Sequence, residues 1–373
     1  MPSLSCLPDE SVATALFRRS LIGWYERDHR PLPWRETANP YFIWLSEVIL
    51  QQTRVEQGTA YYHRFIEAFP TVFHLADADE DQVLKLWQGL GYYSRARNLR
   101  VAAQRLLQEY GGSLPADRKK LLALPGIGPY TAAAILSFAY DLPFVAVDGN
   151  VQRVVSRLFA LPLPVDSPQG KKEVDRLADL LLDREHPRLF NNATMELGAT
   201  VCLPVSPRCS DCPVADFCLA QKLGTAEELP LKSPKRQLRD RYFHYIDVRD
   251  SRSASPLMLL GRRGGGDIWQ GLYQPLLVET PVAMEPADFL ASDSFVSLKR
   301  SFPSLEPKGY TSVETHVLTH QRIHARLYRA EADLETSCLD DYPPYQLIMV
   351  DDLPIYAFPR LLEILWKKGD VLF

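Results

Sequence analysis

The sequence lacks the features that would place the chain in or across a membrane. Its 373 residues contain no apolar stretch as long as a membrane span. The first ten residues lack the basic segment and apolar run of a secretory signal. Internal repeats and low-complexity tracts are also missing from the sequence. We therefore expect a protein of the cytosol with no membrane partner.

The sequence also lacks an excess of basic residues. Lys and Arg total 42 against 46 Asp and Glu, and the pI is near 6.1. This balance argues against a nucleic-acid partner, which usually leaves a basic footprint. Total charge can hide a local stripe, however, because residues 88–108 hold four arginines and no acid: Arg95, Arg97, Arg100 and Arg105. A solvated helix face and a basic contact surface both remain open as interpretations.

Length and pattern predict two domains. Helical periodicity runs through the first part of the chain, over 41–57, 60–68, 80–90, 94–110, 121–140, 148–160, 171–183 and 190–200. After Tyr242, short aromatic and β-branched runs predict strands at 242–248, 256–261, 271–279, 316–332 and 345–350, with a closing helix at 359–368. We expect an all-α domain over residues 1–225, a connector over 226–241 and an α/β domain over 242–373.

Cysteine is scarce, with six residues in the chain, and in a cytosolic protein these do not predict disulfides. Cys6 and Cys338 stand apart and are interpreted as free thiols. The other four form a C-x6-C-x2-C-x5-C pattern that predicts a metal centre: Cys202, Cys209, Cys212 and Cys218. Structural zinc usually takes short knuckles on separate segments. A cubane spreads its ligands more widely, so the pattern favours an iron–sulfur cluster over zinc.

A glycine turn lies between two predicted helices in LPGIGPYTA, residues 124–132. Gly126 and Gly128 permit a helix–hairpin–helix turn whose backbone N–H groups point outward, and the next helix begins there with its positive end. Such a turn can bind a phosphate without a basic side chain. A plain tight connection between helices is the alternative, and glycine turns of that kind are common.

Two carboxylates have the chemistry that glycosidic cleavage needs. Glu47 has Ile43, Trp44 and Leu50 one turn away, so it lies on a narrow exposed stripe or is buried. If it is buried, its pKa rises and it can act as a general acid. Asp148 precedes a helix, where it can cap the helix and remain ionised near the positive end. One carboxyl group would protonate the leaving group, and the other would stabilise a sugar cation.

These features stand in one order along the chain: a glutamate in an apolar helix, a glycine hairpin, an aspartate and a four-cysteine loop. The order resembles the endonuclease III superfamily. The segments at 32–53, 87–99, 124–135 and 147–154, together with the cysteine spacing, resemble its adenine DNA glycosylase (MutY) family over residues 10–225. The resemblance implies a helix–hairpin–helix glycosylase domain with a 4Fe-4S cluster. It also implies a monomer that acts on double-stranded DNA with A:8-oxoguanine or A:G mispairs.

The resemblance also implies roles for individual residues. Glu47 matches the general acid that protonates adenine, and Asp148 matches the carboxylate that stabilises the sugar cation or forms a covalent intermediate. Tyr130 and Asn150 match residues that line the site and orient these groups. Related lyases carry a lysine at the position of Tyr130, so removal of the base without strand cleavage is implied. Arg35 matches an adenine-pocket residue.

Further implied roles concern the base opposite adenine. Gln52 and Tyr92 match residues that wedge into the base stack beside the oxidised guanine. The rear domain resembles a Nudix-like domain that recognises the opposite base, and it lacks the R-E-x-x-E-E array of a pyrophosphatase. Its recognition loop, usually Phe-Ser-His, is Leu318-Thr319-His320 here. The hydroxyl and imidazole are kept, but the aromatic ring is not. Alternatively, Thr319 only ends a strand.

Two rival functions remain open on the sequence alone. One is an endonuclease III-like glycosylase with lyase activity, which Tyr130 and the added rear domain disfavour. The other is a non-catalytic iron–sulfur protein that binds DNA or carries electrons. Release of free adenine from a duplex would separate both rivals from a monofunctional adenine glycosylase.

Overall fold

The chain folds into two units. The computed structural model describes residues 12–234, 237–250, 252, 256–334 and 344–372, so the predictions for the first ten residues, Cys6 and Cys338 lie outside the described residues. Unit 1 consists of Met1–Asp77 and Val101–Lys235, and unit 2 of Ala78–Arg100 and Arg236–Phe373. The break after residue 235 lies inside the predicted connector. The linear division did not predict that residues 78–100 group with unit 2.

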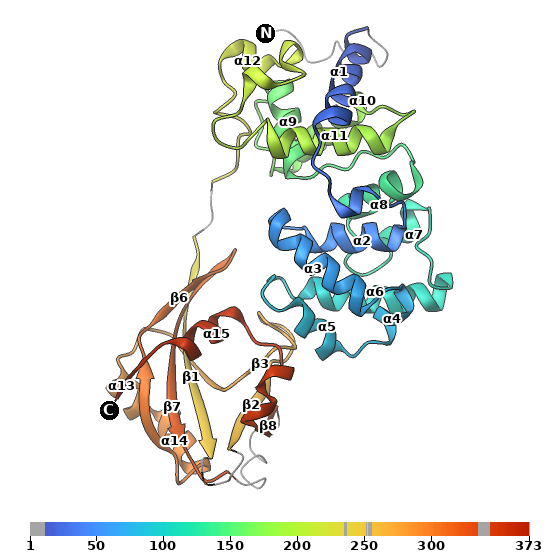
Figure 1. The fold of residues 1–373 in the computed structure, drawn as a ribbon. Coiled ribbons are helices and arrows are strands. Elements are labelled where there is room, and N and C mark those ends of the chain that lie inside the picture. The colour runs from blue at the N-terminus through green and yellow to red at the C-terminus, as the bar shows by residue number, and fades with distance from the viewer. Residues whose placement is uncertain (1–11, 235–236, 251, 253–255, 335–343, 373) are drawn as a thin grey trace. The chain divides into compact units, whose positions relative to one another are not determined.

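Unit 1 is helical (Figure 1). Helix α6 (Ser94–Tyr110) begins in the segment assigned to unit 2 and ends in unit 1. The other elements are α1 (Val12–Asp28), η1 (Pro33–Arg35), α2 (Pro40–Ile49), α3 (Val55–Ala68), α4 (Val72–Asp77), α7 (Arg118–Leu122), α8 (Pro129–Tyr140), α9 (Gly149–Leu158), α10 (Pro168–Leu181), α11 (Pro187–Thr200), η2 (Cys209–Asp211), η3 (Ala215–Phe217) and α12 (Leu219–Leu223).

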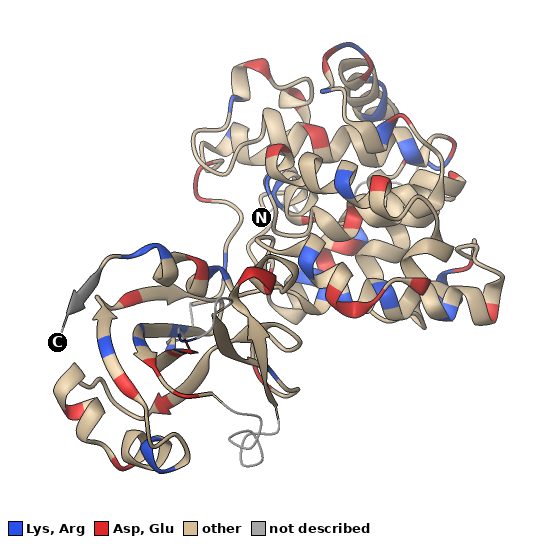
Figure 2. Ribbon diagram, turned by 60° about the horizontal axis from the view of Figure 1, so that its bottom comes forward, with Lys and Arg blue, Asp and Glu red and all other residues tan. Residues whose placement is uncertain are grey.

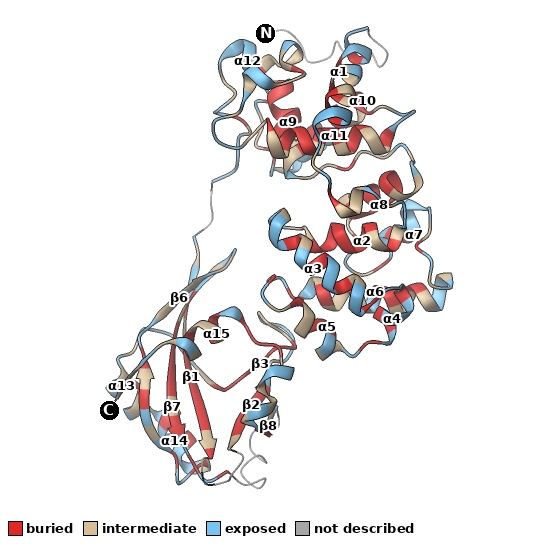
Figure 3. Ribbon diagram, in the orientation of Figure 1, coloured by how far each residue is buried: buried red, intermediate tan, exposed pale blue. Residues whose placement is uncertain are grey.

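The helix starts in unit 1 follow from local sequence. Asn39 caps α2 and Ser167 caps α10, and a proline follows each cap, where its missing N–H costs nothing. Buried faces of α1, α9, α10 and α11 pack into one core, as the colouring of Figure 3 shows. Helices α2 and α8 pack against each other around Ile43 and Ala134. This packing brings the predicted glutamate helix beside the helix that follows the glycine hairpin.

The predicted helix over 41–57 is wrong in one respect. Helix α2 ends at Ile49, and α3 begins at Val55 rather than near residue 60. The intervening turn holds Gln52 at a φ of 60°, a left-handed conformation that a continuous helix cannot contain. Neither glycine nor proline marks this turn in the sequence, so the hydrophobic periodicity predicted one continuous helix across it.

The arginine stripe is neither a solvated face nor a free basic surface. The guanidinium of Arg95 lies over the ring of Trp87, and Arg97 and Arg100 donate to backbone carbonyls. Arg105 pairs with a carboxylate one turn away. Figure 2 shows acidic and basic residues interspersed along the helices. None of the described helices combines the length and apolar character that crossing a membrane requires.

Unit 2 contains a mixed sheet whose nine described strands run in the order β3-β2-β1-β7-β5-β9, with β4, β6 and β8 paired off this path. Parallel pairing of β1 with β7 over eleven residue pairs forms its centre. The strands are β1 (Arg239–Asp250), β2 (Leu257–Arg262), β3 (Tyr273–Gln274), β4 (Leu276–Thr280), β5 (Glu306–Thr311), β6 (Glu314–Val317), β7 (Gln321–Glu331), β8 (Tyr345–Met349) and β9 (Asp370–Leu372). The helices are α5 (Glu80–Trp87), α13 (Pro286–Ala291), α14 (Asp293–Ser301), η5 (Val350–Ile355) and α15 (Arg360–Lys367).

Both faces of the sheet are buried, so its central strands are apolar on both sides. Tyr245 of β1 contributes to a core with Leu361 of α15, and its neighbour Ile246 contributes to a core with Phe289 of α13. The strand predicted over 316–332 is in fact two strands, β6 and β7. A turn at Leu318–His320 separates them, closed by a bond from the Leu318 N–H to the Gln321 carbonyl.

Candidate active site

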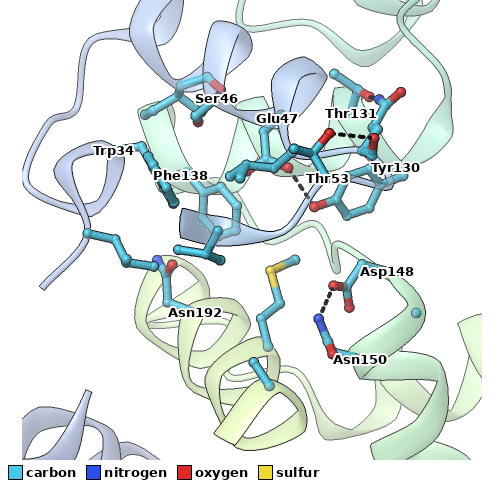
Figure 4. A pocket seen from close by; sticks show the side chains of 18 of the residues that line it. Trp34, Ser46, Glu47, Thr53, Tyr130, Thr131, Phe138, Asp148, Asn150 and Asn192 are labelled. Atoms are coloured by element: carbon cyan, nitrogen blue, oxygen red, sulfur yellow. Dashed lines mark hydrogen bonds between the residues drawn. The ribbon is translucent and has the colours of Figure 1, made fainter. Parts of the chain in front are cut away.

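A cavity of about 720 Å³ opens in unit 1. Its wall comes from three stretches that are far apart in the sequence, within residues 30–55, 126–150 and 188–199, and Figure 4 shows Glu47, Tyr130 and Asp148 at this cavity. Eight of the residues singled out from the sequence line it: Arg35, Glu47, Gln52, Gly126, Gly128, Tyr130, Asp148 and Asn150. The fold therefore gathers these predicted residues around one space.

Glu47 lies on α2, and its neighbours on the helix are also buried. Only 7% of Glu47 is exposed, so the exposed-stripe interpretation is wrong. Burial raises the pKa of Glu47 to about 7. The Tyr130 hydroxyl donates a hydrogen bond to Oε2 at a distance of 2.5 Å, and this bond acts to lower the pKa. The negative charge of Asp148 raises this pKa further. A carboxyl group of this kind can hold a proton near neutral pH and donate it.

Tyr130 lies at the start of α8, directly after the glycine hairpin. Gly126 adopts a φ of 77°, which favours glycine, and the Ile127 N–H donates to the Leu124 carbonyl to close the turn. A Cβ added to Gly128 would meet no atom within 4 Å, so the backbone there is open to a large partner. Burial raises the pKa of Tyr130 well above its usual value, and the nearby carboxylates raise it further. Tyr130 is therefore a neutral hydrogen-bond donor.

Asp148 has the capping role that its position predicts. Its Oδ1 accepts a bond from the Val151 N–H at the start of α9, and its Oδ2 accepts a bond from the Asn150 amide, each at 2.7 Å. Burial nevertheless raises the pKa of Asp148 above its usual value. The helix terminus alone had suggested the opposite direction. The two hydrogen bonds favour the charged form and oppose burial.

Arg35 reaches the cavity from η1 and is held by a buried carboxylate that the sequence did not single out. Glu196 of α11 is fully buried and accepts bonds from Arg35 at 2.7 Å and from Arg30 at 2.7 and 2.8 Å. Burial acts to raise the pKa of Glu196, but bonds from the two guanidiniums outweigh it and lower the pKa to about 2. Arg35 therefore has a fixed direction along the cavity wall.

The predicted wedge residues share a backbone feature. Gln52 and Tyr92 are both exposed and both have a positive φ, 60° and 46° respectively. Such conformations in non-glycine residues cluster at functional sites, where surrounding structure holds them. Gln52 lines the cavity of unit 1.

Tyr92 belongs to unit 2, where its hydroxyl lies 2.7 Å from the hydroxyl of Thr319. Thr319 and His320 are exposed in the β6–β7 turn and line a second cavity, of about 600 Å³. Thr319 therefore lies in a turn, with its hydroxyl paired to a predicted wedge residue, rather than merely ending a strand.

The four cysteines lie in one loop after α11, and three of them pack against the core of unit 1. Burial raises the pKa of Cys212 to about 12, and the other three thiols raise it further, so they lie within electrostatic range. Among the described residues, no three His, Cys, Asp or Glu side chains are gathered for a single metal ion. Four cysteines in one loop match the number of thiolate ligands that a 4Fe-4S cluster takes.

Two buried arginines connect this loop with the aspartate cap. Arg157 donates to Sγ of Cys202 at 3.3 Å, and Arg153 donates to the Cys202 carbonyl at 2.7 Å. Arg153 also donates to Oδ1 of Asn150 at 2.8 Å, and the Asn150 amide in turn bonds to Asp148. Continuous hydrogen bonds thus run from the cysteine loop to the carboxylate of the cavity.

Known proteins match this chain over the segments that form the cavity. Residues 45–181 match the family model of the HhH-GPD superfamily base excision DNA repair proteins. The adenine DNA glycosylase of Buchnera aphidicola subsp. Baizongia pistaciae is 32% identical over 263 residues, which cover 70% of this chain and 74% of that protein. The chain belongs to the adenine DNA glycosylase family.

Other members of the family are longer. Human adenine DNA glycosylase is 43% identical over 222 residues, which cover 57% of this chain but 41% of the human protein. The rat protein is 44% identical, and the matched residues cover 42% of its length. The chain thus spans less than half the length of these mammalian adenine DNA glycosylases.

Solved structures confirm the fold expected for the family. A thermostable thymine-DNA glycosylase, 28% identical, covers 57% of this chain and 97% of its own with a TM-score of 0.52. The endonuclease III of a DNA complex, 24% identical, gives a TM-score of 0.50 and agrees in fold. The chain is a helix–hairpin–helix glycosylase domain followed by an α/β domain, whose mixed sheet fits a Nudix-like fold.

The cofactor expected from the cysteine spacing is also confirmed. Residues 202–218 match the iron–sulfur binding domain of endonuclease III. The family therefore carries a 4Fe-4S cluster, and the zinc alternative is set aside. Cys202, Cys209, Cys212 and Cys218 are the residues that would hold it.

Sequence reasoning missed the residues that hold the lining residues of the unit 1 cavity in place. Glu196, Arg30, Arg153 and Arg157 act through contacts with residues 45 to 166 positions away. A glutamate or arginine on an amphipathic helix gives no sign of such a partner. Only the apolar surroundings of Glu196 in NATMELGAT pointed toward its burial.

Proposed function

We propose that the chain removes adenine from mispaired duplex DNA by hydrolysing its bond to the sugar. The observation that carries the proposal is the carboxyl pair of the unit 1 cavity. Glu47 is buried with a pKa near 7, while Asp148 is held by two hydrogen bonds that favour its charged form. Two carboxyl groups with different environments provide an acid and a charge stabiliser in one site.

The proposed reaction begins with the proton on Glu47. Its transfer to a ring nitrogen of adenine lets the C1′–N bond break, and the bonding electrons leave with the base. The sugar is then a cation, which the Asp148 carboxylate stabilises directly or by transient bonding. Water adds to C1′ and passes its proton to a carboxylate of the pair. The products are free adenine and an abasic site.

Strand cleavage is not part of the proposal. A lyase needs an amine that attacks C1′ and forms a Schiff base. At the hairpin position where such an amine would be placed, this chain has Tyr130, whose hydroxyl is neutral and already bonded to Glu47. An endonuclease III-like lyase is therefore disfavoured, and a non-catalytic role leaves the buried acid unexplained.

DNA binding in the proposal uses backbone as well as side chains. The open turn at Gly126 and Gly128, with the positive end of α8 behind it, would bind a phosphate beside the flipped nucleotide. Arg35, fixed by Glu196, would contact adenine inside the cavity. We propose a monomer acting in the cytosol, where reducing conditions preserve thiolate ligands.

Recognition of the opposite base is assigned to unit 2 in the proposal. Oxidation at C8 of guanine turns the N7 acceptor into a donor and adds a carbonyl oxygen. A hydroxyl can both accept and donate, so Thr319, with Tyr92 beside it, would distinguish 8-oxoguanine from guanine. Gln52 and Tyr92 would enter the base stack beside that base.

The decisive experiment measures free adenine released from duplexes with A:8-oxoguanine, A:G or A:T by the full chain with its cluster. We expect release from the first two and intact strands until alkali is added. Glu47→Gln should slow release by about 100-fold or more. Glu67 is an exposed glutamate of α3, so Glu67→Gln is the matched control and should leave the rate of adenine release unchanged. Failure of the wild-type protein to release adenine would refute the proposal.

A further inference from the structure

The second cavity, of about 600 Å³, lies entirely within unit 2. One wall is formed by residues 89–94 with Arg97, and another by residues 316–321, which include the β6–β7 turn. A third wall is the loop from Asp267 to Trp269. The first two walls carry the proposed recognition residues, whereas no role has been assigned to the third.

Trp269 has an unusual backbone in this loop. Its φ is 59°, a conformation that bulky residues rarely adopt and that persists only where surrounding structure enforces it. The indole is half-buried against the sheet core and lies 6.0 Å from the ring of His316 between centroids. A large aromatic side chain is thus held in a strained position on a cavity wall.

The restraint on this loop comes from Asp267. Both of its oxygens accept from Arg241, at 2.7 and 2.8 Å, and it also accepts from Arg263 and from the Ile268 N–H. Four bonds occupy the lone pairs that a carboxylate offers, so Asp267 has no capacity left for a ligand. Asp267 is therefore a positioning residue, which fixes the backbone that precedes Trp269.

The chemistry of the walls favours an aromatic ligand that carries negative charge. Leu318 offers only an aliphatic surface beside Thr319. The cavity is also lined by the rings of Tyr92, Tyr93, His316 and His320, and the indole of Trp269 is the largest aromatic face in it. Arg97 and Arg360 also line the cavity, and Arg97 bonds to a backbone carbonyl rather than a carboxylate, whereas Arg360 is paired with Glu363. The charge of Asp267 is neutralised by its two arginines. A nucleotide within DNA combines a flat base with an anionic backbone and matches this lining.

We propose that Trp269 is a stacking surface for the purine opposite the excised adenine. The inference rests on the proposed function, because that function assigns the opposite base to unit 2. It adds a contact with the face of the base, whereas Thr319 would contact its edge. Stacking tolerates either guanine or 8-oxoguanine, so Trp269 provides affinity, and Thr319 provides the distinction between them.

The test deletes the aromatic ring and the base separately and together. The full chain with its cluster is bound to duplexes that carry a reduced abasic residue in place of adenine. Opposite it stands 8-oxoguanine, guanine or a second abasic residue. Trp269→Leu should weaken binding about 10-fold when a purine is present. Binding to the doubly abasic duplex should stay within about twofold, since no base is there to stack. Trp269→Phe should recover most of the loss.

Trp366→Leu is the matched control. Trp366 packs against Phe358 on the same core and donates to Asp247, but it does not line the cavity. It should show no loss that depends on the base. Asp267→Asn should weaken purine-dependent binding when Trp269 is present. Added to Trp269→Leu, it should have no further effect, as expected for a residue that acts through the indole.

Two results would overturn the inference. The first is that Trp269→Leu weakens all duplexes equally, which would indicate a structural role, and the second is that it weakens none. Neither result touches adenine release by the wild-type protein, so failure of this inference is distinguishable from failure of the proposed function. Conversely, base-dependent binding through Trp269 can be measured even in a protein that releases no adenine.

Discussion

The hydroxyl of Tyr130 donates a hydrogen bond to Oε2 of Glu47 over 2.5 Å, and it opposes the effect of burial on this carboxyl group. Burial favours the protonated acid, and the hydrogen bond favours the ionised form. The balance leaves the pKa of Glu47 near 7. Tyr130 thus adjusts the acid that the proposed reaction needs.

The single-turnover rate of adenine release should therefore fall as pH rises through about 7. Glu47 holds its proton below that pH and is an ionised, inactive acid above it. Tyr130→Phe removes the bond that favours ionisation, so the pKa rises and the fall in rate moves to higher pH. Rate–pH profiles of the two proteins measure this shift. A shift toward lower pH would contradict the assignment.

Asp148→Asn should separate the two roles of this residue. Asparagine caps helices about as well as aspartate, so α9 should keep its start and the melting temperature should change little. The charge that stabilises the sugar cation is lost, and base excision should slow by about 100-fold or more. Thermal unfolding and single-turnover excision are measured on the same preparation. An unfolded variant, or one with near-native rates, would contradict this division of roles.

Glu196→Gln should destabilise unit 1. The variant leaves two arginines without the carboxylate that binds both, and breaking a buried ion pair typically costs about 3 kcal/mol. The pKa of Glu196 is lowered to about 2, so the folded protein gains stability above the usual value near 4.5 and loses it as pH falls toward 2. Urea unfolding near neutral pH should show the difference, which should shrink at acid pH. Glu173→Gln, from an exposed pair with Arg176, should cost under about 1 kcal/mol.

Thr319→Val should reduce the preference for A:8-oxoguanine over A:G by about 10-fold. Valine keeps the shape of the side chain and removes the hydroxyl that Tyr92 contacts at 2.7 Å. Tyr92→Phe removes the other hydroxyl of this pair and serves as the comparison. Excision rates on both duplexes measure the preference. Unchanged discrimination in Thr319→Val would exclude its hydroxyl from recognition.

Purified protein should contain about four irons per chain. Cys212→Ser should lose iron and lower the melting temperature, because Cys212 packs against the core of unit 1 and the loop is continuous with α11. Cys338→Ser should keep its iron, since Cys338 is outside the four-cysteine pattern. Iron and zinc are counted in protein prepared without oxygen. Stoichiometric zinc with no iron would contradict this prediction.

The sequence predicted the residues whose chemical type the reaction dictates. An acid, a second carboxylate, a glycine hairpin and four thiols have few substitutes, so their spacing along the chain is enough to recognise them. The sequence did not decide whether Glu47 is buried, because that depends on α8, which packs against α2 from about 80 residues away. The turn at Gln52 was missed for a similar reason, since its backbone is held by surroundings rather than by glycine or proline.

Supporting ion pairs were beyond prediction. Glu196 and Arg30 are 166 positions apart, and neither residue alone identifies the other as its partner. The loop before Trp269 is held by Asp267, which binds Arg241 of strand β1, 26 positions earlier in the chain. Charge and proline content predict the connector over 226–241, and the two compact units divide after residue 235. The membership of residues 78–100 in unit 2 was not predictable, because their helical pattern is the same as that of their neighbours.

The discontinuity of unit 2 affects how the protein can be made. Residues 78–100 leave the ribosome about 135 residues before the rest of their unit. At about 5–20 residues per second, the first of their partners follows roughly 7 to 27 seconds later. During that interval Leu84 and Trp87, which are fully buried in the finished protein, must be covered by other parts of the nascent chain or by chaperones. Synthesis rate and chaperone supply should therefore affect the yield of folded protein.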